Sequence, residues 1–144
     1  MKILLSINPE YVERIFSGIK KYEYRKKIFK NKNVGTIVIY STYPVKKIVG
    51  EFEIEKIIKD CPEELWNLTS KTSGIEESKF KKYFTGKNEG YAIKIGKIIK
   101  YEIPKELEEF SIKIAPQSFQ YLYEQEEKEK AEANKNNLKL EGIV

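Results

Sequence analysis

The residues best suited to chemistry gather in residues 18–27, which combine Lys20, Lys21, Glu23 and Arg25 with two tyrosines. If this stretch is an extended strand, Glu23 and Arg25 lie two residues apart and share one face. Lysine and arginine attract phosphate, and arginine also binds the edge of guanine through two hydrogen bonds. A carboxylate accepts a hydrogen bond from the exocyclic amine of a base. The stretch therefore predicts recognition of a nucleotide or a nucleic acid.

The same charged side chains allow two other interpretations. A ribonuclease needs a base that takes the proton of the 2′-hydroxyl and cations that stabilise the phosphorane. Glu23 with Lys20 and Arg25 supplies both. Alternatively, Glu23 and Arg25 form an ion pair that only stabilises the fold. These residues alone leave binding, catalysis and a structural ion pair open.

The overall composition favours a polyanionic partner. The chain of 144 residues has a net charge of +5 and ten tyrosines. Residues 124–144 hold six acids and four bases, which leaves a charge of +7 for the first 123 residues. A basic body rich in tyrosine suits nucleic acid better than a membrane surface.

Other classes of protein are excluded by what the sequence lacks. It has no histidine, which excludes Ser-His-Asp and Cys-His catalysis and zinc sites built on imidazole. We predict neither a metal site nor a cofactor. Cys61 is the single cysteine, which is typical of a protein of the reducing cytoplasm. No segment is long and apolar enough to span a membrane, and the apolar run at the N-terminus is too short for a signal peptide.

The first half of the chain predicts mainly strands. Residues 3–7 are typical of a buried strand, and Asn8 with Pro9 favours the start of a helix that ends at Gly18. The apolar stripe of that helix extends to Ile19. Residues 18–27 then begin a strand, and residues 36–40 predict a central one. Residues 45–58 alternate in polarity as a long strand does, and Gly50 predicts a bulge or bend within it.

The second half predicts a helical insertion followed by further strands. One helix begins at Pro62, and a second covers residues 76–84. Residues 91–103 return to the alternation of a strand, and residues 104–110 predict a turn with a short helical piece. Residues 112–115 predict a last short strand. A final helix is expected from residues 116–122 to about residue 134, with Ser118 as a candidate N-cap.

Together these elements predict an α+β fold with five to six strands, peripheral helices, a two-helix insertion and a C-terminal helix. Glycines inside two long strands favour a small sheet that is strongly bent or closed into a β-barrel. We expect residues 1–123 to form one domain and residues 124–144 to form a helical extension with a tail. The acidic helix after Tyr123 is a candidate contact for a protein partner.

Several segments, taken together in their order along the chain, resemble the ASCH domain family, which belongs to the PUA-like barrels. They include the Gly18-x-Lys20-x-x-Glu23-x-Arg25 pattern and the run from Leu4 into the first helix. The remaining segments are Tyr40-Ser41-Thr42-Tyr43-Pro44, Val49-Gly50-Glu51-Phe52, Gly90-Tyr91-Ala92-Ile93 and Ala115-Pro116-Gln117-Ser118-Phe119. The resemblance covers residues 1–123.

The resemblance implies a barrel with a cleft along the Lys20–Arg25 pattern and a ligand related to RNA or nucleotides. Some proteins of the family are thought to be ribonucleases, or amidohydrolases that act on an acetylated cytidine nucleoside. Lys20 matches the lysine of those amidohydrolases, but Glu23 stands where they carry a threonine. Because a carboxylate does not replace a hydroxyl nucleophile, this difference favours binding over that hydrolysis.

We therefore predict a cytoplasmic module that binds RNA or a nucleotide and reads a single-stranded or modified base. The alternative is a hydrolase that acts on RNA or on a modified nucleoside, with Lys20 and Glu23 as catalytic residues. The predicted ligand-binding residues are Lys20, Lys21, Glu23, Arg25, Tyr40, Ser41, Thr42, Gln117 and Ser118.

Overall fold

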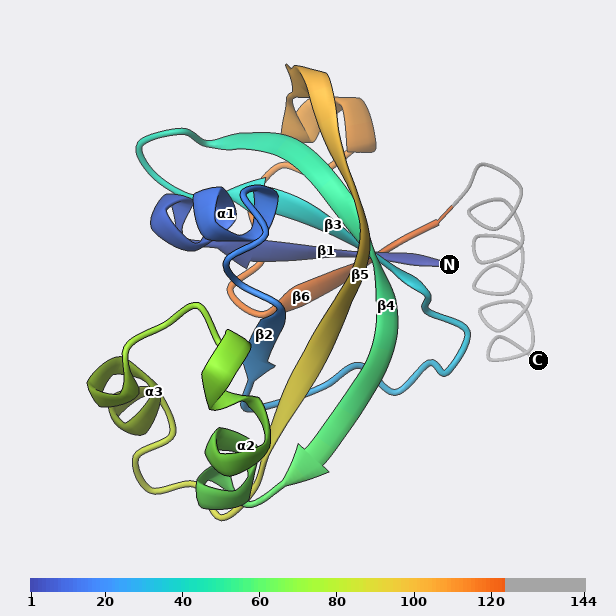
Figure 1. The fold of residues 1–144 in the computed structure, drawn as a ribbon. Helices are drawn as coiled ribbons and strands as arrows, with labels where there is room; N and C mark the ends of the chain where they lie inside the picture. Colours follow the sequence, from blue (N-terminus) through green and yellow to red (C-terminus); the bar gives the residue numbers. More distant parts are fainter. Residues whose placement is uncertain (124–144) are drawn as a thin grey trace, which may run out of the picture.

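The computed structural model describes residues 1–123 of the chain. Within this part lie six strands, three α-helices and two 3-10 helices (Figure 1). In chain order they are β1 (Lys2–Ile7), α1 (Pro9–Phe16), β2 (Tyr22–Arg25), β3 (Thr36–Ser41), β4 (Lys47–Asp60), α2 (Pro62–Thr69), η1 (Ser70–Thr72), α3 (Glu77–Tyr83), β5 (Gly90–Lys105), η2 (Leu107–Phe110) and β6 (Phe119–Leu122).

One curved sheet holds all six strands in the order β2-β5-β4-β3-β1-β6. β1 and β3 are parallel, and the other neighbours are antiparallel. The α+β fold with six strands and three helices agrees with the prediction. In the described part of the chain β2 and β6 are the two edges of the sheet, so a barrel closed by hydrogen bonds is not confirmed.

The helix predicted after the first strand is present, although it is shorter than its apolar stripe suggested. The Asn8 side chain accepts a hydrogen bond from the Glu10 backbone N–H at 2.9 Å, and Pro9 occupies the first turn. Val12 and Ile15 are buried against the sheet. The expectation that Ile19 belongs to this stripe was wrong, because the helix ends at Phe16 and Ile19 is 63% exposed.

The bulge predicted at Gly50 is confirmed and bends the long strands β4 and β5. The register between them shifts between Ile48 and Gly50. A Cβ atom at Gly50 would lie 2.6 Å from the carbonyl oxygen of Ile99, so only glycine allows the two backbones to approach this closely. β4 and β5 are long, curved strands of the sheet (Figure 1).

The end of the domain differs from the prediction. Residues 112–115 form no strand, and residues 119–122 form strand β6 instead of the start of a helix. β6 pairs antiparallel with β1, with Phe119 opposite Leu5, so Ser118 precedes a strand and caps no helix. The helix and tail expected over residues 124–144 lie outside the described residues.

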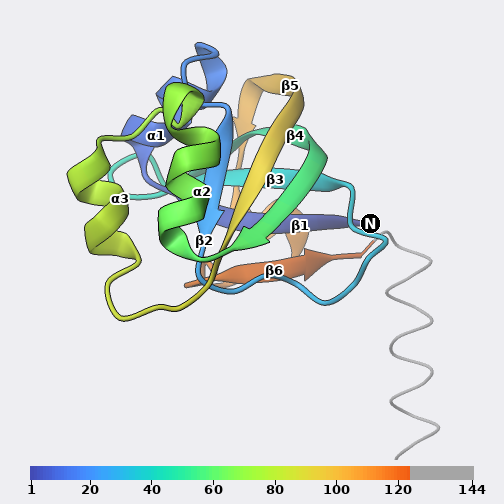
Figure 2. The ribbon, with the colours of Figure 1, turned by 60° about the horizontal axis from the view of Figure 1, so that its bottom comes forward.

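The helices α1, α2 and α3 gather on one side of the sheet (Figure 2). The insertion formed by α2 and α3 packs its buried Leu65, Phe80 and Phe84 against Tyr22 and Tyr24 of β2. No helix within residues 1–123 is long and apolar enough to cross a membrane. The packing of the insertion on β2 fixes the surroundings of the charged residues next to it.

Candidate nucleic-acid interface

Lys20, just before β2, is a lysine that the fold buries almost completely. Its side chain is 1% exposed. The ammonium donates hydrogen bonds to the carbonyl of Tyr22 and, at 3.4 Å, to that of Ser73. It lies 3.8 Å from Oε1 of Glu23 and 4.9 Å from the centre of the Tyr24 ring. Carbonyl oxygens, a carboxylate and a ring face thus replace the water that an exposed ammonium would bind.

Burial changes the proton affinity of this amine. Desolvation lowers the pKa of Lys20 below its usual value, because the charged form loses its hydration. The carboxylate of Glu23 opposes this shift, whereas the cations of Arg14 and Arg25 add to it. A buried amine with a lowered pKa beside a carboxylate is a common feature of functional sites.

The loop after η1 covers Lys20 because Gly74 lies directly against it. Gly74 has φ +69°, a conformation that favours glycine. A Cβ atom there would lie 2.4 Å from Cβ of Lys20 and 2.5 Å from its Cα. The carbonyl of Gly74 also accepts a hydrogen bond from Arg14 of α1 at 2.8 Å. Glycine at this position therefore lets the insertion close over the lysine.

Arg25, at the end of β2, links this edge strand to β1. Its Nη2 donates to the carbonyl of Ser6 at 3.0 Å, and the Ser6 hydroxyl donates to the carbonyl of Pro116 at 2.7 Å. The Nε of Arg25 lies 3.8 Å from Oε2 of Glu23. That nitrogen is buried and has no hydrogen-bond partner among the described residues. A buried donor without an acceptor is rare and calls for an explanation.

A cavity of about 420 Å³, which we name the Lys20 cavity, opens beside Lys20 and Glu23. β2 supplies Tyr24, α1 supplies Tyr11, and the α3 region supplies the opposite wall. The complete lining is Tyr11, Lys20, Glu23, Tyr24, Ile75, Lys79, Lys82 and Tyr83. Aromatic and apolar surface thus surrounds one buried ion pair, with two lysines of α3 at its edge.

A second cavity of about 290 Å³, the Arg25 cavity, adjoins the first. Its lining is Arg25, Lys26, Lys27, Tyr83, Lys87, Gln117 and Ser118. Tyr83 lines both cavities, and its hydroxyl accepts a hydrogen bond from the backbone N–H of Lys26 at 3.2 Å. The ammonium of Lys26 lies 4.7 Å from the centre of the Tyr83 ring. The two cavities therefore form one surface region divided by a tyrosine.

The structure brings together some of the predicted site residues. Lys20 and Glu23 line the Lys20 cavity, and Arg25, Gln117 and Ser118 line the Arg25 cavity. Together with the 3.8 Å approach of Glu23 and Arg25, this places five of the nine in one region. The five residues are Lys20, Glu23, Arg25, Gln117 and Ser118.

The other four predicted residues lie elsewhere. Tyr40 packs in an apolar cluster with Leu4, and Ser41 is 2% exposed at the end of β3. The backbone N–H of Thr42 donates to the carbonyl of Ile7. Lys21 is exposed and lines neither cavity.

Tyr11, Lys79, Lys82 and Tyr83 line the region without having been singled out from the sequence. The last three of these lie in α3, with Lys82 and Tyr83 three and four residues after Lys79, so they share one side of that helix. Phe80 and Phe84 are buried. That amphipathic pattern is visible in the sequence and would have indicated a basic, aromatic helix face. Within residues 1–123 no group of three cysteine, aspartate or glutamate side chains is placed to hold a metal ion.

Comparison with known proteins finds relatives in sequence and a similar solved structure. The large ribosomal subunit protein uL22 of Ureaplasma parvum is 32% identical over 120 residues, 83% of this chain and 39% of that protein. An ASCH domain-containing ribonuclease of Zymomonas mobilis is 31% identical over 83 residues, 58% of this chain and 56% of that protein. The crystal structure of ASCH from Zymomonas mobilis superposes with a TM-score of 0.78 and 26% identity, over 92% of this chain and 94% of that chain.

A family model of the ASCH domain matches residues 5–141, which is almost the whole sequence. The match includes the strand, the helical insertion and the loops that build both cavities. This chain therefore belongs to the ASCH domain family.

Proposed function

We propose that this ASCH domain binds single-stranded RNA across the Lys20 and Arg25 cavities. The observation that carries the proposal is the buried Nε of Arg25, which has no hydrogen-bond acceptor among the described residues, in a residue that lines a cavity. A phosphate oxygen or the edge of a base supplies the acceptor that this nitrogen lacks. The charge of the surrounding surface favours a polyanion as the source of that oxygen.

Exposed lysines supply the attraction to the strand. They come from the loop after β2, from α3 and from the loop after α3, so cations surround both cavities. These side chains are Lys26, Lys27, Lys79, Lys82 and Lys87. Phosphate contacts of this kind release counterions, so binding weakens as salt rises. They position the strand and carry no information about its sequence.

The groups that can select a base lie deeper. Tyr83 is half-buried between the cavities, where its ring can stack with an unpaired base. The Glu23 carboxylate accepts hydrogen bonds from an exocyclic amine, and Arg25 donates to a carbonyl or ring nitrogen. Recognition of this kind requires a base that is not already paired, which favours single-stranded over double-stranded RNA.

The relatives support a setting that involves RNA. One bears the name of a ribonuclease and another that of a ribosomal protein. The chain spans 39% of the uL22 relative and 56% of the ribonuclease relative, so the roles of those whole proteins do not transfer with the match.

The proposal is tested by measuring the anisotropy of a fluorescently labelled single-stranded hexanucleotide over a range of salt concentrations. A double variant, Lys26→Ala with Lys82→Ala, should reduce the slope of log affinity against log salt by about 1.4, since each phosphate contact to a single strand contributes about 0.7. The matched control is Lys97→Ala, an exposed lysine of β5 that lines neither cavity. An RNA affinity that does not change with salt concentration would contradict the proposal. An equal reduction of the slope in the control variant would also contradict it.

A second candidate function is cleavage of the bound RNA, which the approach of Glu23 to both Lys20 and Arg25 favours. Glu23 would take the proton of a 2′-hydroxyl, whose oxygen attacks the adjacent phosphorus to form a 2′,3′-cyclic phosphate, while the 5′-oxygen leaves and takes a proton from solvent. The Nε of Arg25, which donates no hydrogen bond within the described residues, would donate to the phosphorane oxygens. Glu23→Gln should then abolish cleavage and change RNA affinity by less than about threefold. Retained cleavage in this variant excludes Glu23 as the base.

Hydrolysis of an acetylated cytidine has less support than either function. Among the described residues, the lining of the Lys20 cavity includes no serine or threonine that would act as a hydroxyl nucleophile. Release of acetate from acetylcytidine by the purified protein would reverse this ranking.

A further inference from the structure

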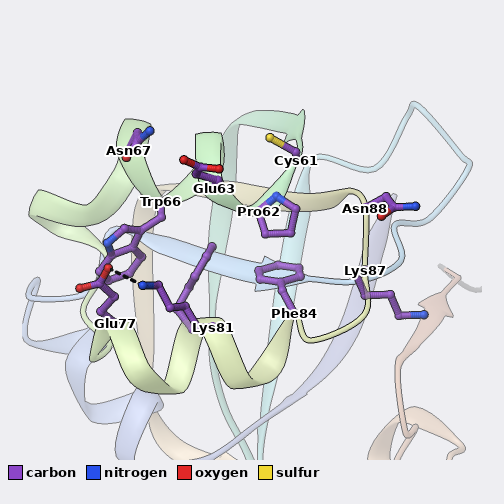
Figure 3. Close-up of a pocket in the computed structure, with 11 residues that line it drawn as sticks. Cys61, Pro62, Glu63, Trp66, Asn67, Glu77, Lys81, Phe84, Lys87 and Asn88 are labelled. Atoms are coloured by element: carbon purple, nitrogen blue, oxygen red, sulfur yellow. Dashed lines mark ion pairs between the residues drawn. The ribbon is translucent and has the colours of Figure 1, made fainter.

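A third and larger cavity, the Trp66 cavity, lies between α2 and α3 on the insertion and has a volume of about 630 Å³ (Figure 3). α2 contributes Trp66 and Asn67, and the end of α3 with the loop behind it contributes Phe84, Lys87 and Asn88. This volume lies within the range of cavities that bind small organic ligands. Neither the family pattern nor the two cavities at β2 accounts for it.

The aromatic side of this cavity contains Trp66, whose indole can stack with a ligand ring. Trp66 is half-buried, so part of its indole remains available to a ligand. Behind it, the Phe80 ring lies 4.8 Å from the indole, and Phe84 lies 4.9 Å from Phe80. These two phenylalanines are 1% and 3% exposed, so the half-buried indole is the most exposed of the three rings that line the cavity.

The polar side of the cavity holds Glu63, Asn67 and an ion pair, and a second lysine lies at the far end. Figure 3 shows Lys81 paired with Glu77 near Trp66, and Nζ of Lys81 lies 3.2 Å from Oε1 of Glu77. Lys87 and Asn88 lie at the opposite end, beyond Phe84 (Figure 3). An aromatic ring, side-chain amides and a terminal lysine together match a nucleotide, whose base stacks and whose phosphate is anionic.

Lys87 connects the Trp66 cavity to the proposed RNA-binding region. Lys87 lines both the Trp66 cavity and the Arg25 cavity, so the two cavities meet at this side chain. We propose that the Trp66 cavity is a further base-binding subsite, occupied by a neighbouring nucleotide of the RNA strand held at the Arg25 cavity. This proposal rests on the proposed function and adds a path for the strand, from Tyr83 past Lys87 to Trp66. Linking the subsites through one strand makes affinity depend on oligonucleotide length.

Trp66 itself reports on occupancy, because it is the single tryptophan of the chain. A single-stranded hexanucleotide should quench the tryptophan fluorescence at the concentration that saturates its anisotropy signal. Cytidine monophosphate, which cannot bridge the cavities, should quench it only at concentrations at least about tenfold higher. Cys61 is the single cysteine, is exposed and lines the same cavity, so the hexanucleotide should also slow its reaction with a maleimide.

Two variants separate stacking from folding. Trp66→Leu should weaken hexanucleotide binding about tenfold, which corresponds to one stacked base. Its circular dichroism spectrum should match that of the parent protein. Lys87→Ala, an exposed substitution, should weaken binding about threefold and reduce the difference between hexanucleotide and mononucleotide. Lys97→Ala serves again as the control and should change neither the hexanucleotide affinity nor the difference between hexanucleotide and mononucleotide.

The outcomes distinguish this inference from the function on which it rests. If the hexanucleotide binds and loses affinity on substitution of Lys26 and Lys82, the proposed function holds. Unchanged tryptophan fluorescence and unchanged Cys61 labelling under that condition would overturn the further subsite alone. Absence of hexanucleotide binding in the anisotropy assay would overturn both.

Discussion

The Lys20 cavity and the Arg25 cavity adjoin each other but hold their charges differently. In the first, the Lys20 and Glu23 side chains are 1% and 10% exposed, and burial lowers the pKa of the lysine. In the second, Lys26, Lys27 and Lys87 are exposed. Salt screens buried charges little, whereas interactions between exposed charges more than about 10 Å apart are largely screened at about 0.1 M salt.

This difference separates two tasks on one surface. Exposed lysines attract a phosphate backbone from solution, and their contribution follows the salt concentration. The buried pair cannot attract a distant strand, but its fixed geometry selects what enters the cavity or reacts there. Substitutions of the buried pair should therefore affect stability and pH dependence, and those of the exposed lysines around both cavities should affect salt dependence.

The largest effect is expected where the backbone closes over Lys20. Gly74→Ala should lower the free energy of unfolding by about 3 kcal/mol, because the new Cβ meets Lys20 and because alanine is strained at φ +69°. The control is Gly86→Ala, where φ is +77° but no atom lies within 4 Å, and its cost should be about 1 kcal/mol. Equal losses in urea unfolding would show that the contact with Lys20 is not tight.

The buried lysine should make the free energy of unfolding depend on pH. The pKa of Lys20 is lowered in the folded protein from its usual 10.5, so between these two values the unfolded chain binds more protons. The free energy of unfolding should therefore rise with pH across this window, relative to that of Lys20→Met. Unfolding by urea at several pH values measures the difference between the two proteins.

Comparison with the variant is needed because tyrosines act in the opposite direction. Burial raises the pKa of Tyr24 to about 12, so stability is lost as pH rises above the usual value of 10. Both proteins share this loss, which cancels in the difference. A difference that stays constant with pH would mean that the Lys20 ammonium is not desolvated in the folded protein.

A smaller effect is expected at the bond that ties β2 to the insertion. Tyr24 donates its hydroxyl proton to Oγ1 of Thr69 at 2.7 Å, since Thr69 donates its own to the carbonyl of Leu65. Tyr24→Phe should cost about 1 kcal/mol in the free energy of unfolding at neutral pH. Tyr43→Phe, at a residue that is 77% exposed, is the matched control and should change it by less than about 0.5 kcal/mol. Equal free energies of unfolding for the two variants would show that this hydrogen bond does not stabilise the fold.

The smallest change in stability is expected on the exposed side. Lys27→Ala should alter the free energy of unfolding by less than about 0.5 kcal/mol, because its side chain is exposed. The same variant should reduce the slope of log RNA affinity against log salt by about 0.7. A stability loss comparable to that of Gly74→Ala would remove the contrast between the two cavities.

Local signals in the sequence were sufficient for much of the fold. Asn8 and Pro9 predict the start of α1, and Gly50 predicts the bulge, because capping and close approach depend on the residue itself. The order Lys20, Glu23 and Arg25 likewise identified the strand that borders both cavities.

Long-range contacts account for what the sequence did not reveal. Residues 119–122 pair with β1, which lies more than a hundred residues earlier, and the charged run after them suggested a helix instead. The burial of Lys20 likewise depends on Ser73 and Gly74, about fifty residues away in the chain. Tyr40 and Ser41 lie at a strand end as expected, but the fold turns them into the interior.

The central claim, that RNA occupies the region between β2 and α3, is tested most directly by an NMR titration. Backbone amide resonances would be followed while a single-stranded hexanucleotide is added to the protein. The account predicts shifts concentrated at residues 23–27, 79–88 and 117–118, with little change at Lys97 and its neighbours on β5. Shifts confined to β4 and the outer part of β5, with none at Glu23, Arg25 or Tyr83, would contradict it.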